Sequence, residues 1–426
     1  MKIAIVPDLH LNKAIYKGVK DRNDPSLPFR SVDFMRSFEY IVDHCINELH
    51  PDLFIIPGDV YDHPAPSNRV RGMFSSQLQK LTKAEIPVII LLGNHDVFLQ
   101  NHALTDIKEL GLKHVKVVEH PSIISYKTSK LLLFPYSLDV EQKKVTIKEE
   151  FTKFLAKIKE KDDGTPSLFF GHFSVHGAKM NEYVVDDLLT DTDTDTTTTT
   201  TEIPASAKRD YINKNPNDIK VSDLDKIGAE YVFLGDFHEF QILNTKKCIA
   251  IYGGSIEKSD FSEITQKKGF LWYDSEAEVE GQMGKCRFIE YPNCRPMMEL
   301  NGTLDVVKKQ LDKYNAKDYQ DAMVKIVFEG TSDEKLIFSS GEEALKKDLR
   351  ERLNPINIVT DYKLKNDDQK EAASKLEIAM LEKGHLGAED IIEVAEEMLS
   401  NRIKDPVELA ATLDLNRLIF DEVTKG

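Results

Sequence analysis

Five short apolar runs in this chain are each followed directly by a short motif of glycine, aspartate, asparagine or histidine residues. This arrangement constrains the fold more than any other feature. The runs cover residues 3–7, 53–57, 88–92, 168–170 and 231–234. Short apolar runs bounded by turn residues are typical of buried strands. A further apolar run at residues 131–135 predicts another strand of the same kind.

Amphipathic helices are predicted between the first runs. Between the first and second runs, five apolar residues recur at helical spacing: Phe34, Phe38, Ile41, Cys45 and Leu49. Residues 70–81 also show a helical pattern before the third run. Strands that alternate with helices in this way predict an α/β layered fold with buried central strands.

The polar residues that follow the five runs are suited to bind metal ions. The motifs are Asp8-Leu9-His10, Gly58-Asp59-Val60-Tyr61-Asp62, Gly93-Asn94-His95-Asp96, Gly171-His172 and Gly235-Asp236-Phe237-His238. In open α/β sheets, residues beyond the carboxyl ends of the strands line one crevice. Each motif alone occurs often by chance, but five in order after five strands indicate a single site.

The set of side chains suits two metal ions. Seven candidate ligands are present: Asp8, His10, Asp59, Asn94, His172, Asp236 and His238. A carboxylate can bridge two ions that lie roughly 3.5–4 Å apart, as in two-metal hydrolytic sites. Mixed imidazole and carboxylate ligation favours Mn²⁺, Fe or Zn²⁺ over Mg²⁺, which prefers oxygen ligands.

The order of these motifs resembles the calcineurin-like metallophosphoesterase superfamily, and within it the SbcD-type nuclease subunit of DNA double-strand-break repair. Residues 252–257 (YGGSIE), Asp260-Phe261 and Lys268-Gly269-Phe270 resemble a further segment of that group. The resemblance is close over residues 1–275 and rests on pattern beyond them. It implies a four-layer α/β/β/α sandwich with a small α+β cap domain and a C-terminal helical segment.

The resemblance also implies the roles of the site residues. One divalent ion is expected on Asp8, His10, Asp59 and His238, and the other on Asp59, Asn94, His172 and Asp236. Mn²⁺ is the favoured metal and Mg²⁺ the alternative. His95, next to a ligand, is the expected catalytic residue, since its near-neutral pKa suits a general acid or a stabiliser of the scissile phosphate. Asp96 is either an orienting partner of His95 or a surface carboxylate.

One motif departs from the family pattern, which usually has histidine where this chain has Asp236. An aspartate can ligate the same ion through oxygen and would make the site harder, which favours Mn²⁺ or Mg²⁺. The alternative is that the second ion is held weakly. His176, four residues after His172, is a further histidine for which a metal role and an ordinary structural role both stand.

The implied activity is a metal-dependent DNA nuclease, with 3′→5′ exonuclease action on duplex DNA and endonuclease action on single strands. The implied partners are DNA, an SbcC-type coiled-coil ATPase and a second copy of the chain. Two other interpretations remain. One is a general metallophosphoesterase for phosphoproteins or small phosphoesters, and the other is a scaffold in which Asp236 has disabled the second metal.

The chain is expected to contain three regions. Residues 1–292 form the nuclease domain, interrupted by a disordered acidic insert near residues 186–202. Residues 293–365 form the cap domain for DNA, with a helix at 304–314, a strand at 323–329 and a helix that begins near Gly341. Residues 366–426 form a helical segment that binds the ATPase.

The net charge of −16 argues against a generic nucleic-acid binder until its distribution is considered. Residues 366–426 carry −8 and residues 186–202 carry −6, which leaves −2 for the rest. Residues 13–36 carry +3 and begin beside the first metal motif. The candidate phosphate contacts are Lys13, Lys17, Lys20, Arg22, Arg30 and Arg69.

Further features indicate the compartment. No apolar run approaches the roughly 20 residues that span a bilayer, and the first residues do not resemble a signal peptide. The four cysteines form no C-x-x-C pair, which fits a reducing cytoplasm. We therefore expect a cytoplasmic protein without a membrane partner, in a bacterial, archaeal or phage-infected cell.

Overall fold

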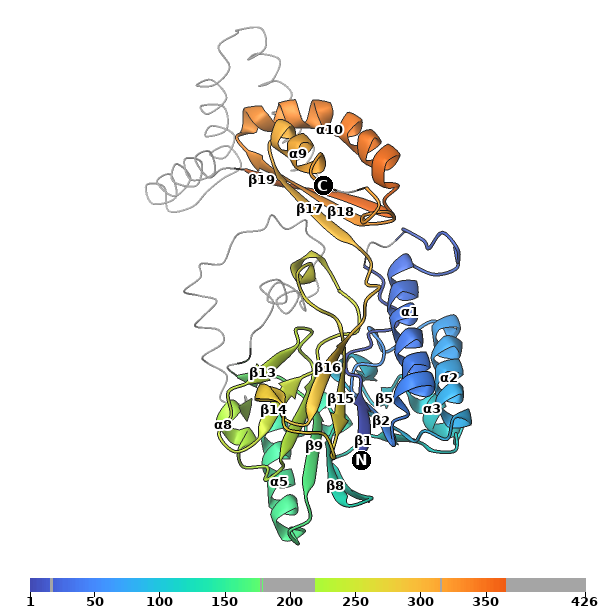
Figure 1. Cartoon of the computed structure of the whole chain (residues 1–426), viewed down its shortest axis with the longest axis vertical. Helices are drawn as coiled ribbons and strands as arrows, with labels where there is room; N and C mark the ends of the chain where they lie inside the picture. The colour runs from blue at the N-terminus through green and yellow to red at the C-terminus, as the bar shows by residue number, and fades with distance from the viewer. Residues whose placement is uncertain (16–17, 177, 179–218, 315, 365–426) are drawn as a thin grey trace, which may run out of the picture. The chain divides into compact units, whose positions relative to one another are not determined.

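The computed structural model describes residues 1–15, 18–176, 178, 219–314 and 316–364. The predicted insert at 186–202 and the predicted helical segment at 366–426 lie outside the described residues. The chain divides into two compact units (Figure 1). Among the described residues, the first comprises Met1–Met298, Tyr319–Met323 and Pro355–Asn357, and the second comprises Glu299–Asp318, Val324–Asn354 and Ile358–Leu364.

The first unit contains two six-stranded sheets. The first sheet has the order β16-β15-β1-β2-β3-β6. Four consecutive strands of this sheet run parallel: β1 (Lys2–Ile5), β2 (Leu53–Pro57), β3 (Val88–Leu91) and β6 (Val115–Val118), the last at one edge. The antiparallel strands β15 (Gly269–Asp274) and β16 (Cys286–Glu290) complete the other edge. Three of the five predicted strands with polar ends are therefore parallel neighbours in one mixed sheet.

The second sheet has the order β13-β14-β12-β9-β8-β7. Its parallel strands are β8 (Ser129–Phe134), β9 (Ser167–His172), β12 (Tyr231–Gly235) and β14 (Ile249–Tyr252). The antiparallel edge strands are β7 (Ser122–Tyr126) and β13 (Gln241–Leu243). The register pairs Gly235 with His172, so the fourth and fifth motifs leave this sheet side by side.

Successive side chains of a strand point to opposite faces of its sheet. One apolar cluster therefore lies between the two sheets and one lies on the outer face of each sheet, under its helices, which gives four layers. Ile3 and Ile5 of β1 pack against Phe170 and Phe233 between the two sheets. Ala4 of the same strand faces the other way, into the cluster that includes the helices α1 (Phe29–His44) and α2 (Asn68–Lys83). Helices α5 and α8 pack on the outer face of the second sheet (Figure 1). The predicted α/β/β/α sandwich is confirmed.

The helices of the first unit begin and end largely as their sequence signals indicate. Helix α1 spans Phe29–His44 and continues as a π-helical turn over Cys45–Leu49, and α2 spans Asn68–Lys83 with Ser67 as its N-cap. Helix α5 spans Ile147–Glu160 behind a capping box. The shorter helices are α3 (Thr105–Glu109), α4 (Leu138–Glu141) and α8 (Val221–Leu224). Within the described residues, no helix is long and apolar enough to cross a membrane.

A three-stranded sheet and two helices form the described part of the second unit. The strands are β17 (Met297–Gly302), β18 (Met323–Gly330) and β19 (Asn357–Leu364), in the order β17-β18-β19. The helices are α9 (Leu304–Leu311) and α10 (Ser332–Leu353). Helix α10 begins nine residues before the predicted start at Gly341. A capping box between Thr331 and Glu334 starts it, and Phe338 is buried in its first half.

Candidate metal centre

The five motifs meet at one edge of the sandwich, where β1, β2 and β3 of the first sheet and β9 and β12 of the second sheet end. Two groups of metal-ligating atoms, each within 4.8 Å of one another, lie here among the described residues. One group is His10, Asp59 and His95, and the other is Asp8, Asp59 and His172. Asp59 belongs to both groups.

The two carboxylate oxygens of Asp59 face different sets of side chains. Its Oδ2 lies 3.5 Å from His10 Nε2, which in turn lies 2.8 Å from His238 Nε2. Its Oδ1 lies 3.3 Å from His172 Nε2. This is the arrangement expected of a carboxylate that bridges two ions.

The remaining candidates surround His172. Its Nε2 lies 2.9 Å from Asn94 Oδ1 and 4.0 Å from Asp236 Oδ1. Asp8 Oδ1 accepts a hydrogen bond from the backbone nitrogen of Asp236 at 2.9 Å and lies 3.9 Å from His172 Nδ1. The structure thus brings all seven predicted ligands together from segments far apart in the sequence.

The backbone is strained at four of these seven residues. Asp8, His10, Asp59 and Asp236 have φ angles of +51°, +39°, +49° and +106°. Non-glycine residues rarely adopt this left-handed region, and such residues gather at functional sites because the surrounding structure must stabilise them.

Glycines let the motifs approach one another. A Cβ on Gly58 would overlap the imidazole of His172, and a Cβ on Gly93 would overlap both Oδ1 and the backbone nitrogen of Asp59. A Cβ on Gly235 would overlap Pro57 O. The glycine that precedes each of these motifs is therefore required by a close contact with another strand end.

Gly93→Ala is expected to weaken Mn²⁺ binding at least tenfold and to lower the free energy of unfolding by about 1–3 kcal/mol, because Asp59 must move. Gly72→Ala is the matched control. Gly72 lies inside α2 with no atom within 4 Å of an added Cβ, so alanine there is expected to stabilise the fold by about 0.5–1 kcal/mol. Calorimetric titration and urea unfolding measure both effects. Equal Mn²⁺ affinity in the two variants would contradict the packing argument.

Two of the candidate histidine ligands have a hydrogen-bond partner on their second ring nitrogen: His172 Nδ1 lies 2.9 Å from Pro57 O, and His238 Nδ1 lies 3.0 Å from Glu263 Oε1. Such partners favour a proton on Nδ1 and leave the Nε2 lone pair for a metal ion. His10 Nδ1 lies 3.2 Å from Asp62 Oδ1 but makes no hydrogen bond. Neither Asp62 nor Glu263 was predicted to have a role at the site. Asp62 stands within the second motif, but no local spacing indicates Glu263.

Burial and mutual repulsion perturb the acidic residues of the site. Burial, with a contribution from Asp59, raises the pKa of Asp8 to about 7. Burial would also raise the pKa of Asp59, but His172 and His95 outweigh it and hold that pKa well below its usual range. Burial and the neighbouring His238 lower the pKa of His10 to about 3, so its imidazole is neutral and able to ligate.

These residues fit divalent cations. Asp8 Oδ2 is buried without a hydrogen-bond partner, and the neutral imidazole of His10 lies 3.5 Å from the Asp59 carboxylate. Burying several carboxylates together is costly without a compensating positive charge. The donor set of imidazole nitrogens, carboxylates and one amide oxygen suits Mn²⁺, Fe or Zn²⁺.

His95 lies beside the candidate ligands, and its neighbour Asp96 does not orient it. His95 Nδ1 lies 3.0 Å from Asp62 O, and its ring centroid lies 5.0 Å from that of His10. Asp96 is fully buried and accepts hydrogen bonds from the backbone nitrogens of Val60, Tyr61 and Gly93. Both interpretations of Asp96 were wrong, because this carboxylate joins the loops of the second and third motifs. His176 belongs to neither ligand group among the described residues.

The structure corrects one of the predicted DNA contacts. The Arg30 side chain is fully buried, so it is not a surface contact for DNA. Lys20 is exposed, whereas Lys13, Arg22 and Arg69 pair with the carboxylates of Asp62, Asp321 and Asp24. Lys17 lies outside the described residues. These five remain predictions.

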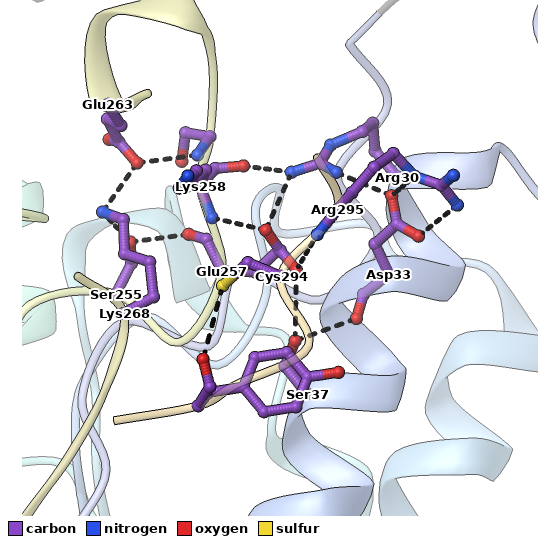
Figure 2. A network of polar contacts seen from close by, with 12 residues as sticks. Arg30, Asp33, Ser37, Ser255, Glu257, Lys258, Glu263, Lys268, Cys294 and Arg295 are labelled. Atoms are coloured by element: carbon purple, nitrogen blue, oxygen red, sulfur yellow. Dashed lines mark hydrogen bonds and ion pairs between the residues drawn. The ribbon is translucent and has the colours of Figure 1, made fainter. Parts of the chain in front are cut away.

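Arg30 instead belongs to a buried network of charged groups (Figure 2). Asp33 Oδ2 accepts hydrogen bonds from Arg30 Nη1 and Arg295 Nε, each at 2.6 Å. Asp33 Oδ1 accepts a further one from Arg295 Nη2 at 2.6 Å. Glu257 lies 3.7 Å from Arg30 Nη2 and also accepts from the Arg295 backbone nitrogen. The network joins α1 to the segment that precedes β17.

Asp33→Ala is expected to lower the free energy of unfolding by about 3–5 kcal/mol, because it leaves two buried guanidinium groups short of a carboxylate. Asp139→Ala is the control, since the Asp139–Lys144 pair is exposed and such pairs contribute about 0–1 kcal/mol. Urea unfolding measures the difference. Equal losses in the two variants would mean that the network does not stabilise the fold.

Comparisons with known proteins identify the family of the chain. The profile of the calcineurin-like phosphoesterase family matches residues 1–240. SbcD, a subunit of the nuclease SbcCD of Staphylococcus epidermidis, is 23% identical over 336 residues, which are 75% of this chain and 77% of that protein. The uncharacterized metallophosphoesterase YhaO of Bacillus subtilis is 20% identical over 78% of this chain and 72% of its own length.

A DNA double-strand break repair protein Mre11 from Aeropyrum pernix is 31% identical over 116 residues, which are 27% of this chain. The match covers only 26% of that protein's own length. Together these matches confirm the resemblance inferred from the motifs.

Proposed function

The chain belongs to the calcineurin-like phosphoesterase family, and we propose that it is a metal-dependent DNA nuclease of the SbcD type. Members of the family hydrolyse phosphoesters, so the finer question is the substrate. The family profile ends at residue 240, whereas the match to SbcD covers 75% of the chain and so extends past it. This extended match is the observation that carries the proposal.

The proposed centre holds two divalent ions, with Mn²⁺ favoured. By the family resemblance, Asp8, His10, Asp59 and His238 would hold one ion, and Asp59, Asn94, His172 and Asp236 would hold the other. In the structure, Asp8 lies in one group with Asp59 and His172. Bound ions of this kind supply Lewis-acid activation of water and offset charge at phosphorus. Asp236 contributes an oxygen ligand in place of the usual histidine, which supports a hard metal.

Protein side chains supply the remaining chemistry. His95 is the proposed catalytic residue, since it is exposed beside Asp59 and can reach a phosphate oxygen or the leaving oxygen. Its Nδ1 is engaged by Asp62 O, so Nε2 is the atom available to substrate. Partial desolvation of the ring opposes protonation of His95, but the nearby Asp59 carboxylate raises its pKa above the usual value, which suits an acid that donates a proton near neutral pH.

The rest of the chain is assigned by the same resemblance. We infer 3′→5′ exonuclease action on duplex DNA and endonuclease action on single strands, carried out by a homodimer. Residues 293–365 are the proposed cap for DNA, and residues 366–426, which lie outside the described residues, are the proposed binding segment for an SbcC-type ATPase. Lys13, Lys17, Lys20, Arg22 and Arg69 remain candidates for phosphate contacts.

Digestion of end-labelled duplex DNA in the presence of Mn²⁺ tests the proposal, with Asp59→Asn as the inactive comparison. We expect manganese-dependent shortening of the labelled strand by the wild-type protein alone or with an SbcC-type ATPase. Absence of DNA cleavage under both conditions, together with hydrolysis of a phosphopeptide, would overturn the proposal in favour of a general metallophosphoesterase.

A further inference from the structure

Both ring nitrogens of His238 have polar partners. Its Nε2 faces His10 Nε2 at 2.8 Å, and its Nδ1 lies 3.0 Å from Glu263 Oε1 and 3.2 Å from Ser259 Oγ. The carboxylate of Glu263 is 2% exposed. A buried carboxylate that accepts from Nδ1 determines which ring nitrogen carries the proton and how the ring is oriented.

A buried lysine holds Glu263 in turn. Lys268 Nζ lies 2.7 Å from Glu263 Oε2 and has no exposed surface. The same ammonium group donates to His238 O at 2.9 Å, to Ser255 Oγ at 2.9 Å and to Gln266 Oε1 at 2.8 Å. Figure 2 shows Lys268 between Glu263 and Ser255. Lys268 thus contacts both the backbone of His238 and the carboxylate that orients its ring.

Gly254 allows the segment after β14 to approach the backbone of His238. Gly254 has φ +74°, and a Cβ there would lie 2.8 Å from Phe240 N and 2.9 Å from His238 O. The next residue, Ser255, donates its backbone N–H to His238 O at 3.1 Å. The segment after β14 therefore lies directly against the loop that carries His238, which fixes that loop independently of the carboxylate.

Stability alone does not explain a charged pair in this place. Desolvation of a buried carboxylate and ammonium costs as much as their attraction returns, and apolar residues of similar volume often stabilise a fold equally well. A buried pair does, however, impose a specific geometry on the groups that it contacts. Here the contacted groups are the imidazole and the carbonyl of one candidate metal ligand.

We propose that Glu263 and Lys268 are positioning residues that hold His238 with its Nε2 lone pair directed at the metal centre. The inference rests on the proposed metal-dependent function, but it does not depend on DNA being the substrate. Glu263 accepts the Nδ1 proton, and Lys268 prevents the carboxylate and the His238 loop from moving. Residues 253–268, for which the sequence indicated only a family resemblance, thereby have the role of positioning His238 at the site.

Glu263→Gln tests the proposal. The backbone nitrogen of Ser259 donates to Glu263 Oε2, and the Lys268 ammonium lies 2.7 Å from the same oxygen, so the single amide oxygen of glutamine will face them. Its NH₂ group then faces His238 Nδ1, which must become an acceptor and carry its proton on Nε2. We expect Mn²⁺ affinity at one of the two sites to fall about 10- to 100-fold by calorimetric titration.

Another trio in the chain provides a matched control. His102 Nε2 lies 2.7 Å from Glu119 Oε1, and Lys108 Nζ lies 2.6 Å from Glu119 Oε2. His102 belongs to neither ligand group of the described residues. Glu119→Gln is therefore expected to leave both Mn²⁺ affinities unchanged. Equal weakening in the two variants, or no weakening in a folded Glu263→Gln protein, would overturn the proposal.

The wild-type protein gives an independent measurement that needs no variant. In ¹⁵N-histidine-labelled, metal-free protein, we expect the nitrogen chemical shifts of His238 to report a proton on Nδ1. A proton on Nε2 would overturn the proposal. These measurements involve no DNA, so a failure of the nuclease assignment and a failure of this inference are separable.

Discussion

Asp59→Asn is expected to lower Mn²⁺-dependent phosphodiester hydrolysis by more than about 1,000-fold. One oxygen of Asp59 faces His10 and the other faces His172, so the substitution removes charge from both proposed metal sites. Loss of an indirect partner already costs about 10- to 100-fold in metal affinity, and a bridging ligand should cost more. Calorimetric titration should therefore show both Mn²⁺ affinities weakened by more than about 100-fold.

Asn is nearly isosteric with Asp, so the variant is expected to fold. The control is Asp139→Asn, which removes a carboxylate from an exposed pair with Lys144 and should leave activity and metal binding unchanged. If Asp59→Asn lost only one of the two Mn²⁺ equivalents and kept the other at full affinity, the bridging role of Asp59 would be refuted.

His95→Ala should separate metal binding from catalysis. We expect hydrolysis to fall by about 100- to 10,000-fold, the range observed for loss of a general acid, while both Mn²⁺ affinities stay within about threefold of the wild type. The expectation rests on the exposed position of His95 beside Asp59 and on the engagement of its Nδ1 by Asp62 O. Steady-state kinetics and calorimetric titration of the same preparation provide the two readouts.

His63→Ala is a suitable control for this experiment. His63 is exposed in the loop after the second motif and belongs to neither ligand group of the described residues. His95 does lie within ligand distance of His10 and Asp59. Loss of a Mn²⁺ equivalent in His95→Ala would therefore reassign His95 from the catalytic role to metal ligation.

Local pattern was sufficient for the strands and the candidate ligands. The second predicted strand coincides with β2, and the first and third differ from β1 and β3 by one or two residues at their ends. A buried strand of a parallel sheet is apolar on both faces, so its run in the sequence is continuous and its end is abrupt. Because the polar residue that follows such a strand lies at the sheet edge, the seven candidate ligands could be identified together.

Where an element's start depended on capping, the prediction was less accurate. Helix α10 begins at Ser332 because Thr331 and Glu334 cap each other, although the stronger helical composition begins near Gly341. The spacing of Thr331 and Glu334 is a capping signal that the sequence does contain. The burial of Arg30 was not predicted, because a basic residue in a basic segment carries no sequence signal that distinguishes a buried side chain from an exposed one.

The sequence by itself indicated the candidate metal ligands and where each strand ends, because both depend on neighbours in the chain. Only the tertiary structure decided which side chains the two carboxylate oxygens of Asp59 face and which backbone angles are strained. It also decided which side chains contact and orient the candidate ligands. Arg30 contacts the carbonyl of Lys258, 228 residues away, and His238 is oriented by Glu263 through a buried pair. Such partners are chosen by the packing of two sheets and their loops, and no periodicity along the chain encodes a contact at that separation.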